Sequence, residues 1–269
     1  MADAKKVVFI TGASSGIGRA CAALLHERGY LVYGTSRKPA PIEPWRMVVL
    51  DVRDDASVSA AAAQILAEQG RVDVLINNAG MVLAGALEDT TLDEALAQLD
   101  TNVLGALRMC KAVLPAMRAQ RSGVIINMGS IAGRVGLPFQ GLYSASKFAL
   151  EGFTEALRLE TRPFGVRAVV VEPGDIATGV VQNRVRAAAS GEGSAYLGAF
   201  RKVVASYEKD ESGGASPDVV ARTVLAIIEK GAPAVRYSTG PIAQRLLSGL
   251  KPFLPSKVFE FGLRVFYGL

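Results

Sequence analysis

The residues of this chain that can transfer a proton stand close together near its middle. Tyr143 and Lys147 are four positions apart at the start of a helix-like stretch, and Ser130 precedes Tyr143 by thirteen positions. Positions i and i+4 lie on one face of a helix, so the phenol and the ammonium can face one pocket. A nearby ammonium favours the phenolate and would lower the phenol pKa from about 10 toward the range useful for general acid–base catalysis.

A glycine-rich turn near the N-terminus could bind phosphate. Residues 11–18, TGASSGIG, follow a short apolar run and open a helix-like stretch. Closely spaced glycines let the backbone approach a pyrophosphate, and the next helix offers free N–H groups and a positive dipole end. We expect dinucleotide contacts at the following positions of this turn: Gly12, Ser14, Ser15, Gly16, Ile17 and Gly18.

Taken together, the motifs resemble the short-chain dehydrogenase/reductase family over roughly residues 5–240. They are the Gly-x-x-x-Gly-x-Gly turn, NNAG at 77–80, Ser130, Tyr143 with Lys147, and PGDIAT at 173–178, in that order. The resemblance implies that Tyr143 is the proton donor or acceptor and that Ser130 hydrogen-bonds the substrate oxygen. It also implies that Lys147 holds the nicotinamide ribose, and that Asn102 holds a water linking Lys147 to solvent.

The same resemblance assigns the remaining cofactor contacts. It implies that Asp51 and Val52 touch the adenine, and that Ile176 and Thr178 reach the nicotinamide carboxamide. It also implies that Asn78, Ala79 and Gly80 line the adenosine ribose. Pro173 and Gly174, which follow the sixth strand, are expected to contact the cofactor as well. Asn77 has an alternative interpretation, since a buried amide can simply tie two strands together.

The end of the second strand predicts the choice of cofactor. An NAD enzyme places a carboxylate there for the ribose 2′-hydroxyl, but this chain has Thr35, Ser36 and Arg37. The Arg37 guanidinium could pair with a 2′-phosphate through a charge-assisted fork. NADP is therefore expected rather than NAD, with Ser36 and Arg37 as contacts. The alternative is that Arg37 is a solvated loop cation.

The order of apolar and helix-like segments predicts an α/β fold. Short β-branched runs are expected to form strands at 7–10, 31–35, 47–52, 72–76, 124–128, 166–171 and 234–237. Helices are expected between them at 17–28, 57–68, 102–119, 144–162 and 217–230. This alternation predicts a doubly wound Rossmann-type parallel seven-stranded sheet with helices on both faces, in a single domain spanning 1–269, with ligands at its carboxyl edge.

Two segments depart from the alternation. Residues 174–215 are longer than a simple connection needs, so we expect a substrate lid there. The candidate apolar pocket walls are Val135, Leu137, Phe139, Leu142, Val180, Tyr196 and Phe200, of which about half should touch ligand. Residues 239–269 form an apolar C-terminal extension that prolines divide into short helical pieces. Its apolar face is expected to dock on the core or on a partner subunit, with a membrane surface as the alternative.

Composition narrows the class of protein further. The 269 residues are 50% hydrophobic and 20% charged, with a net charge of +5 that requires no nucleic acid. Cys21 and Cys110 show no ligand-like spacing, so no metal or disulfide is expected, and His26 should face solvent without a catalytic role. No apolar run is long enough to span a bilayer, and no leader is recognised, so the cytoplasm is the expected location.

These features predict an NADP(H)-dependent oxidoreductase that transfers hydride between nicotinamide and a hydrophobic ketone, aldehyde or secondary alcohol. The extended tail is similar to that of the steroid and retinol dehydrogenase-like members of the family, whereas its β-ketoacyl reductases usually end soon after the seventh strand. A β-ketoacyl reductase remains the alternative enzyme, and a non-catalytic dinucleotide-sensing protein is the alternative of another class. The family also implies a homodimer through the helices at 102–119 and 144–162.

Overall fold

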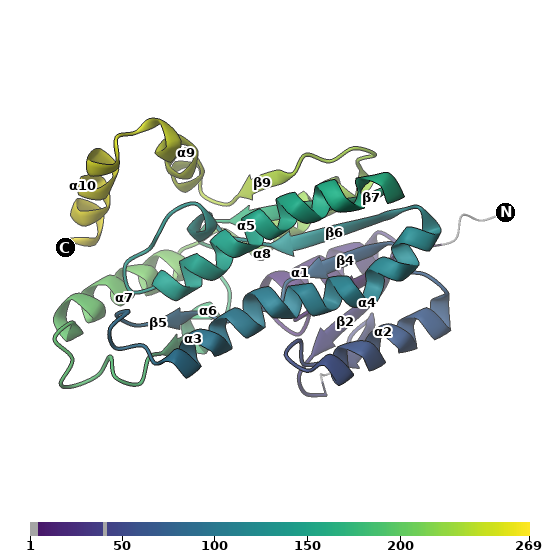
Figure 1. Cartoon of the computed structure of the whole chain (residues 1–269), viewed down its shortest axis with the longest axis horizontal. Coiled ribbons are helices and arrows are strands. Elements are labelled where there is room, and N and C mark those ends of the chain that lie inside the picture. The colour runs from purple at the N-terminus through teal and green to yellow at the C-terminus, as the bar shows by residue number, and fades with distance from the viewer. Residues whose placement is uncertain (1–4, 40–41) are drawn as a thin grey trace.

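The computed structural model describes residues 5–39 and 42–269, and at its centre lies a parallel sheet of seven strands (Figure 1). The first residues of the chain, on which the expectation of no leader partly depends, lie outside the described residues. The strands in sequence order are β1 (Val7–Ile10), β2 (Leu31–Ser36), β3 (Arg46–Val49), β4 (Val74–Asn77), β6 (Gly123–Met128), β7 (Val166–Pro173) and β9 (Arg236–Thr239). Their spatial order is β3-β2-β1-β4-β6-β7-β9, which confirms the doubly wound fold.

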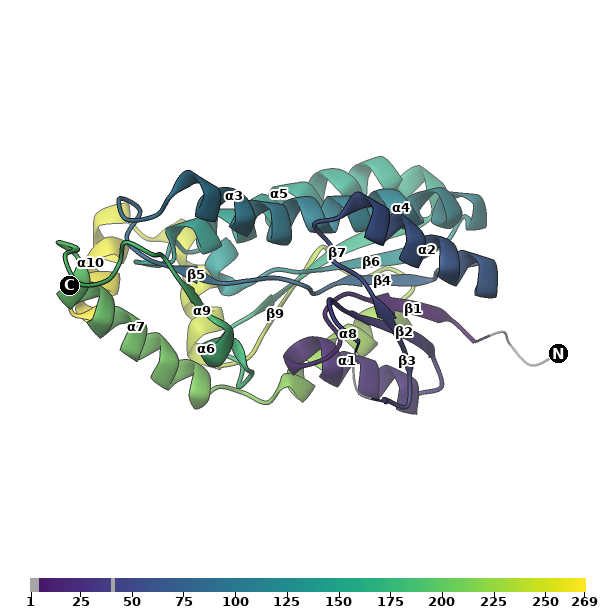
Figure 2. The ribbon, with the colours of Figure 1, turned by 90° about the horizontal axis from the view of Figure 1, so that it is seen from below.

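Helices cover both faces of this sheet (Figure 2). One face carries α1 (Gly16–Glu27) and α8 (Pro217–Glu229), and the other carries α2 (Asp55–Gln69), α4 (Gly105–Gln120) and α5 (Gly141–Thr161). The alternation of side chains along a strand produces the two cores. In β1, Val8 and Ile10 pack toward α1 and α8, whereas Val7 and Phe9 pack toward α2 and α4.

Local signals set several helix boundaries as expected. Ser216 caps α8 by accepting a hydrogen bond from the Asp218 backbone N–H, with Pro217 at the first helical position. The predicted helix at 102–119 begins later, because a π-helical turn, Asp100–Leu104, precedes α4. The short helix α3 (Leu92–Leu99) was not expected, although its capping box of Thr91 and Glu94 is visible in the sequence.

The expected lid contains regular structure. It holds α6 (Val180–Asn183), the short strand β8 (Val185–Arg186) and most of α7 (Leu197–Ser212). Strand β8 pairs in parallel with β5 (Leu83–Ala84), which ties the lid to the segment that follows β4. The lid is therefore held at its centre by backbone hydrogen bonds.

The C-terminal extension folds into α9 (Ile242–Leu250) and α10 (Ser256–Tyr267), joined by a 3₁₀ turn. Both views show α9 and α10 beyond the carboxyl edge of the sheet, at the end of the molecule where α7 also lies (Figures 1 and 2). α10 docks on α7, with the Tyr207 and Tyr267 rings edge to face at a centroid distance of 5.2 Å. No helix among the described residues is long and apolar enough to cross a membrane.

The residues expected to be structural or inert are placed as the sequence indicated. Cys21 and Cys110 are free and buried in the two opposite cores. His26 is exposed on α1. Asn77 is buried, and its amide donates a hydrogen bond of 2.8 Å to the Asn127 side chain, which ties β4 to β6.

Candidate active site

A cavity of about 1110 Å³ lies along the carboxyl edge of the sheet. It extends from the glycine turn after β1, past the ends of β2, β4, β6 and β7, to α7 and the C-terminal extension. Ligand pockets usually measure about 300–1,000 Å³, so the space is large enough for an extended cofactor and a substrate together. All expected site residues line it except Gly18 and Asn102.

The glycine turn has a backbone that fits a pyrophosphate. Gly12 and Gly16 adopt left-handed φ values of 68° and 54°, which other residues rarely accept. The turn leads directly into the N-terminus of α1, whose first N–H groups lack helical partners. Gly18 does not line the cavity, and a Cβ there would lie 2.2 Å from the Gly12 carbonyl oxygen. The structure thus shows a packing reason for a glycine at this position, and its expected cofactor contact stays a prediction.

Asn78 joins the end of β4 to this turn. Its amide donates hydrogen bonds of 3.0 Å to the carbonyls of Thr11 and Gly12. The Thr11 hydroxyl in return accepts from the backbone N–H groups of Asn78 and Ala79 at 2.9 Å. These bonds hold the turn in its open shape while Asn78, Ala79 and Gly80 face the cavity.

The far end of the cavity has charges of both signs. The exposed Arg37 and the half-buried Ser36 lie at the end of β2, beside Asp51. A side-chain hydrogen bond from Arg53 is the main cause of the lowered pKa of Asp51, and the charge of Arg37 contributes. Arg53 pairs with Asp51 at 2.6 Å and also lines the cavity, a contact that sequence reasoning missed. Of the two arginines that line this end of the cavity, Arg53 is in a salt bridge with Asp51, and Arg37 is in none of the described salt bridges.

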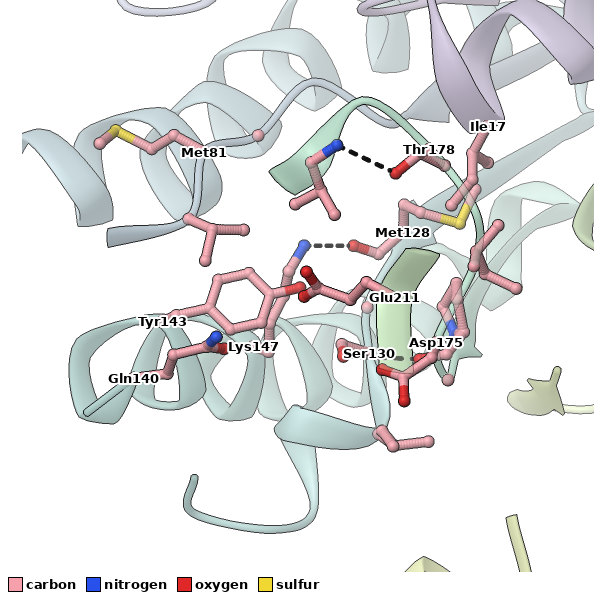
Figure 3. Close-up of a pocket in the computed structure, with 18 of the residues that line it drawn as sticks. Ile17, Met81, Met128, Ser130, Gln140, Tyr143, Lys147, Asp175, Thr178 and Glu211 are labelled. Carbon is pink, nitrogen blue, oxygen red and sulfur yellow. Dashed lines mark hydrogen bonds between the residues drawn. The ribbon is translucent and has the colours of Figure 1, made fainter. Parts of the chain in front are cut away.

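Tyr143 and Lys147 project from α5 into the same pocket, as predicted from their spacing (Figure 3). Burial raises the pKa of Tyr143 to about 12, while Ser130 acts in the opposite direction. The prediction that Lys147 lowers the pKa of Tyr143 is therefore wrong for the groups of this chain, because burial has the larger effect. The Lys147 ammonium instead donates to the Met128 carbonyl, and burial lowers its pKa to about 8.

Ser130 follows β6 and begins a short 3₁₀ turn. Its hydroxyl accepts a hydrogen bond of 3.1 Å from the Ala132 backbone N–H and lies 3.5 Å from the Pro173 carbonyl. The hydroxyl is also close enough to Tyr143 to lower the phenol pKa through a side-chain hydrogen bond. Ser130 can therefore donate to an oxygen that also accepts a proton from Tyr143.

Asn102 lies outside the cavity, in the π-helical turn before α4. Its side-chain oxygen accepts from the Met81 N–H at 2.8 Å, and its amide donates to the Met81 carbonyl and the Ser146 hydroxyl, each at 3.0 Å. Asn102 thus connects the segment after β4 to α5, one residue before Lys147. Its contacts are those of a positioning residue.

The segment after β7 forms the wall opposite the glycine turn. Ile176 makes an isolated bridge to Ala215, and the Thr178 hydroxyl accepts from the Val180 N–H at 3.3 Å. A Cβ at Gly16 would lie 3.3 Å from the Thr178 side chain, so this segment approaches the turn closely. Pro173, Gly174, Ile176 and Thr178 all line the cavity as expected.

Three of the seven candidate residues for the apolar wall line the cavity. Val135, Leu137 and Val180 line the cavity, whereas Phe139 and Phe200 pack edge to face in a separate cluster. Leu142 and the exposed Tyr196 are also absent from the lining. The missing apolar wall comes from the C-terminal extension, through Leu247, Leu254, Phe259, Leu263, Phe266 and Tyr267. The sequence signal for these residues was the apolar spacing already noted for the extension.

Three carboxylates also line this end of the cavity, and sequence reasoning missed them. They are Asp175, Asp210 and Glu211. Glu211 accepts two hydrogen bonds, of 2.5 and 2.6 Å, from the buried guanidinium of Arg184. Burial raises the pKa of Asp175, the hydrogen bond from Gln244 opposes this effect, and the charge of Asp210 adds to it.

These carboxylates are close enough to Tyr143 to affect it electrostatically. The charges of Glu211 and Asp175 raise the pKa of Tyr143, and the charge of Arg184 lowers it. The Arg184 guanidinium and the Lys147 ammonium stand against three carboxylates, so acidic groups outnumber basic ones at the substrate end of the cavity, whose walls are otherwise apolar. Such an end favours a ligand that carries both an apolar body and a cation.

Comparison with known proteins agrees with this geometry. The family model for short chain dehydrogenases matches residues 6–189. A 3-ketodihydrosphingosine reductase of Bacteroides thetaiotaomicron is 46% identical over 265 residues, which cover 98% of each chain. The 17-beta-hydroxysteroid dehydrogenase type 1 of Mus musculus is 38% identical over 255 residues, covering 86% of this chain and 72% of that protein.

Solved structures extend the similarity to the whole fold. A short-chain dehydrogenase from Streptomyces avermitilis superposes with a TM-score of 0.82 at 33% identity, covering 100% of this chain and 99% of the other. A short-chain dehydrogenase from Burkholderia cenocepacia in complex with NADP superposes with a TM-score of 0.72 at 29% identity, covering 92% and 93%. The C-terminal extension thus has a counterpart in at least one solved structure.

Proposed function

This chain belongs to the short-chain dehydrogenase/reductase family and is an oxidoreductase of CH–OH groups, and from this premise we propose that it reduces a long-chain amino ketone with NADPH. Three features support the proposal: the acid–base pair, the uncompensated Arg37, and the carboxylates beside Tyr143. The third feature carries the choice of substrate.

The residues that would hold the cofactor occupy three parts of the cavity. The turn with Gly12 and Gly16 would hold the pyrophosphate, and Arg37 the 2′-phosphate of the adenosine ribose. The residues after β7, with Lys147, would hold the nicotinamide end. A bound nicotinamide cofactor supplies the hydride.

The chain's own groups then manage the proton. Tyr143 is protonated at neutral pH because its pKa is about 12, so it can donate to the carbonyl oxygen as that oxygen gains negative charge. Ser130 would hydrogen-bond the same oxygen. Lys147, fixed by the Met128 carbonyl, supplies positive charge close to the phenol and favours its anionic form after transfer. Asn102 would keep α5 in register by its bond to Ser146.

The substrate proposal follows from the charge of the cavity. An ammonium near the carbonyl would compensate Asp175, Asp210 and Glu211, and a long hydrocarbon chain would contact the apolar walls. 3-Ketodihydrosphingosine, which the name of the Bacteroides relative contains, is a ketone of this kind, with an amino group beside the carbonyl and a long alkyl chain. Steroid ketones would fill the apolar walls but would bring no cation to the carboxylates at this end of the cavity.

The other candidate functions have less support. A β-ketoacyl thioester carries no cation, and the C-terminal extension crosses the substrate end of the cavity through residues such as Phe259 and Tyr267. A dinucleotide sensor would need neither the phenol of Tyr143, the ammonium of Lys147 nor the hydroxyl of Ser130. All three residues line the cavity.

Activity assays with matched ketones test the proposal. Purified protein and NADPH would be assayed with 3-ketodihydrosphingosine, with the same chain lacking the amino group, with estrone, and with an acetoacetyl thioester. A charge-assisted bond contributes about 1.5–3 kcal/mol, so kcat/KM should favour the amino ketone over its deaminated match by about tenfold or more. Equal rates for the two would refute the amino ketone, and no turnover of any ketone would refute the reductase.

Variants assign the preference to the carboxylates. Asp175→Asn and Glu211→Gln should reduce the preference for the amino ketone, whereas Glu208→Gln, a residue of the same helix that does not line the cavity, should retain it. Retained preference in both cavity variants would mean that the ammonium is bound elsewhere.

A further inference from the structure

The outward face of α9 is apolar while its inward face carries a buried polar residue. Ile242, Leu246 and Leu250 are spaced four residues apart and are 69%, 60% and 52% exposed. Ser248 on the same helix is only 2% exposed. A surface helix of a globular protein normally turns its apolar face to the core and its polar face to water. The exposed apolar stripe of α9 is therefore suited to an apolar environment.

α10 and the turn before it continue the apolar surface. Tyr267 packs inward on α7, whereas Phe261 and Val265 are spaced four residues apart and exposed. Phe253, in the connecting turn, is 82% exposed. Of the 22 exposed large apolar side chains in the described part of the chain, eleven lie in residues 242–269. Such a concentration marks an interaction surface.

The charges on this surface select its partner. Arg245, Lys257 and Arg264 are exposed on α9 and α10. The described residues 239–269 contain a single acidic side chain, that of Glu260. Two copies of this surface facing each other across a twofold axis would bring like charges together. A sheet of anionic lipid headgroups would complement both the basic and the apolar residues.

The apolar surface is continuous with the mouth of the cavity. Leu247, Val258 and Phe266 are each exposed and also line the cavity. An apolar molecule leaving a bilayer at this surface could therefore enter the cavity without crossing water. The C-terminal extension is shared by the outer surface and the pocket wall.

We propose that α9, the following turn and α10 form a docking surface for an anionic phospholipid bilayer. The helices would lie in the interface plane with Ile242, Leu246, Phe253 and Phe261 among the acyl chains and the basic residues among the headgroups. No described helix can span a membrane, so the binding is peripheral and reversible.

Vesicle flotation with the full chain tests this proposal. Wild-type protein should float with vesicles of phosphatidylcholine in which roughly one third of the lipid is phosphatidylglycerol, because anionic headgroups attract basic residues near the surface. It should float at least fivefold less with pure phosphatidylcholine, and high salt should weaken the binding to anionic vesicles. Protein that stays in solution with both kinds of vesicle would overturn the proposal. The assay contains no ketone, so its outcome is independent of the proposed reaction.

A matched pair of variants assigns the surface. The double variant Phe253→Glu, Phe261→Glu changes two residues that do not line the cavity and should lose at least tenfold in vesicle binding. Leu92→Glu, Leu96→Glu on α3 changes two side chains of similar exposure, 82% and 62%, and should bind like wild type. Equal flotation of the two double variants would overturn the assignment. So would light scattering in which the tail variant turns a dimer into a monomer, because a second copy would then cover the surface.

Thermal unfolding and turnover keep the comparison interpretable. Both double variants should have melting temperatures within a few degrees of that of wild type. They should also reduce a water-soluble ketone at the wild-type rate, because neither variant changes a residue of the cavity. A tail variant that folds, remains active and still binds anionic vesicles as wild type does would refute the docking surface.

Discussion

The ammonium of Lys147 donates a hydrogen bond of 2.7 Å to the carbonyl of Met128, the last residue of β6. This bond fixes a helix residue of α5 against the carboxyl edge of the sheet. Because the surroundings are otherwise poorly solvated, burial lowers the pKa of Lys147 to about 8 from an ordinary 10.5. We therefore expect the same group to affect both activity and stability.

The stability of the protein should depend on the titration of Lys147. Between pH 8 and about 10 the unfolded chain binds more protons at this position than the folded chain, so the free energy of unfolding rises with pH. Relative to Lys147→Met, wild type should gain about 1–2 kcal/mol across this range. Urea unfolding of both proteins at several pH values measures the difference. Parallel stability profiles would contradict the lowered pKa.

Replacing Tyr143 by Phe should abolish most turnover without affecting cofactor binding. Only the ionisable oxygen is removed, and general acid catalysis contributes about 10²–10⁴-fold in rate. We expect kcat to fall by at least about 100-fold, with the NADPH dissociation constant, measured by fluorescence, within about threefold of wild type. Near-normal turnover would remove Tyr143 from the mechanism.

Arg37 should decide the preference between the two cofactors. A charge-assisted bond to the 2′-phosphate contributes about 1.5–3 kcal/mol, which corresponds to tens-fold to about a hundredfold in affinity. Titration with NADPH and NADH should show that Arg37→Ala loses most of the preference and that Ser36→Asp turns it toward NADH. Arg53→Ala is the control, because the charge of Arg53 is already offset by Asp51. An unchanged ratio in all variants would make Arg37 a solvated cation.

Arg236 should be the main charge that stabilises the carboxylates between α5, β7 and β9. It donates to Glu151 at 2.7 Å and lies 3.6 Å from the fully buried Glu172. Burial is the main cause that raises the pKa of Glu151 to about 7, and the bond from Arg236 opposes it. Arg236→Gln should therefore cost about 2–4 kcal/mol at pH 8.

The pH dependence of that loss identifies its cause. Without Arg236, the pKa of the buried Glu151 should rise further above its value in the unfolded chain. The free energy of unfolding should therefore fall as pH rises, and recover at low pH where Glu151 is protonated. The deficit of Arg236→Gln should be smaller at pH 5.5 than at pH 8 in chemical unfolding. Arg222→Gln, on α8 outside this cluster, serves as a control. A deficit that does not change with pH would show that packing, not charge, is responsible.

Homodimerisation through α4 and α5 remains a prediction. Leu107 on α4 and Leu159 on α5 are exposed apolar residues that a partner subunit could cover. Light scattering should give a dimer at micromolar concentration, and Leu107→Asp with Leu159→Asp should give a monomer. Leu92→Asp, on α3, is the control. A monomeric wild-type protein would contradict the expected interface.

The sequence was sufficient for the features that depend on local order. The Gly-x-x-x-Gly-x-Gly turn, the four-residue spacing of Tyr143 and Lys147, and the alternation of apolar runs with helical stretches are properties of neighbouring positions. They predicted the parallel sheet and its carboxyl-edge cavity, and all of the expected catalytic and cofactor residues except Gly18 and Asn102 line that cavity. Helix limits were less accurate, because the π-helical turn before α4 depends on the contacts of Asn102 with Met81 and Ser146.

Tertiary structure alone decided the substrate end and the protonation of the site. Asp175 and Glu211 are 36 positions apart and line one cavity because backbone hydrogen bonds between Asp175, Ala177 and Ala215 join the two ends of the segment 174–215. The C-terminal extension supplies much of the apolar wall, whereas Phe139 and Phe200 pack edge to face against each other and do not line the cavity. The pKa of Tyr143 was raised, not lowered, since burial and distant carboxylates act through space and leave no mark in the spacing of residues.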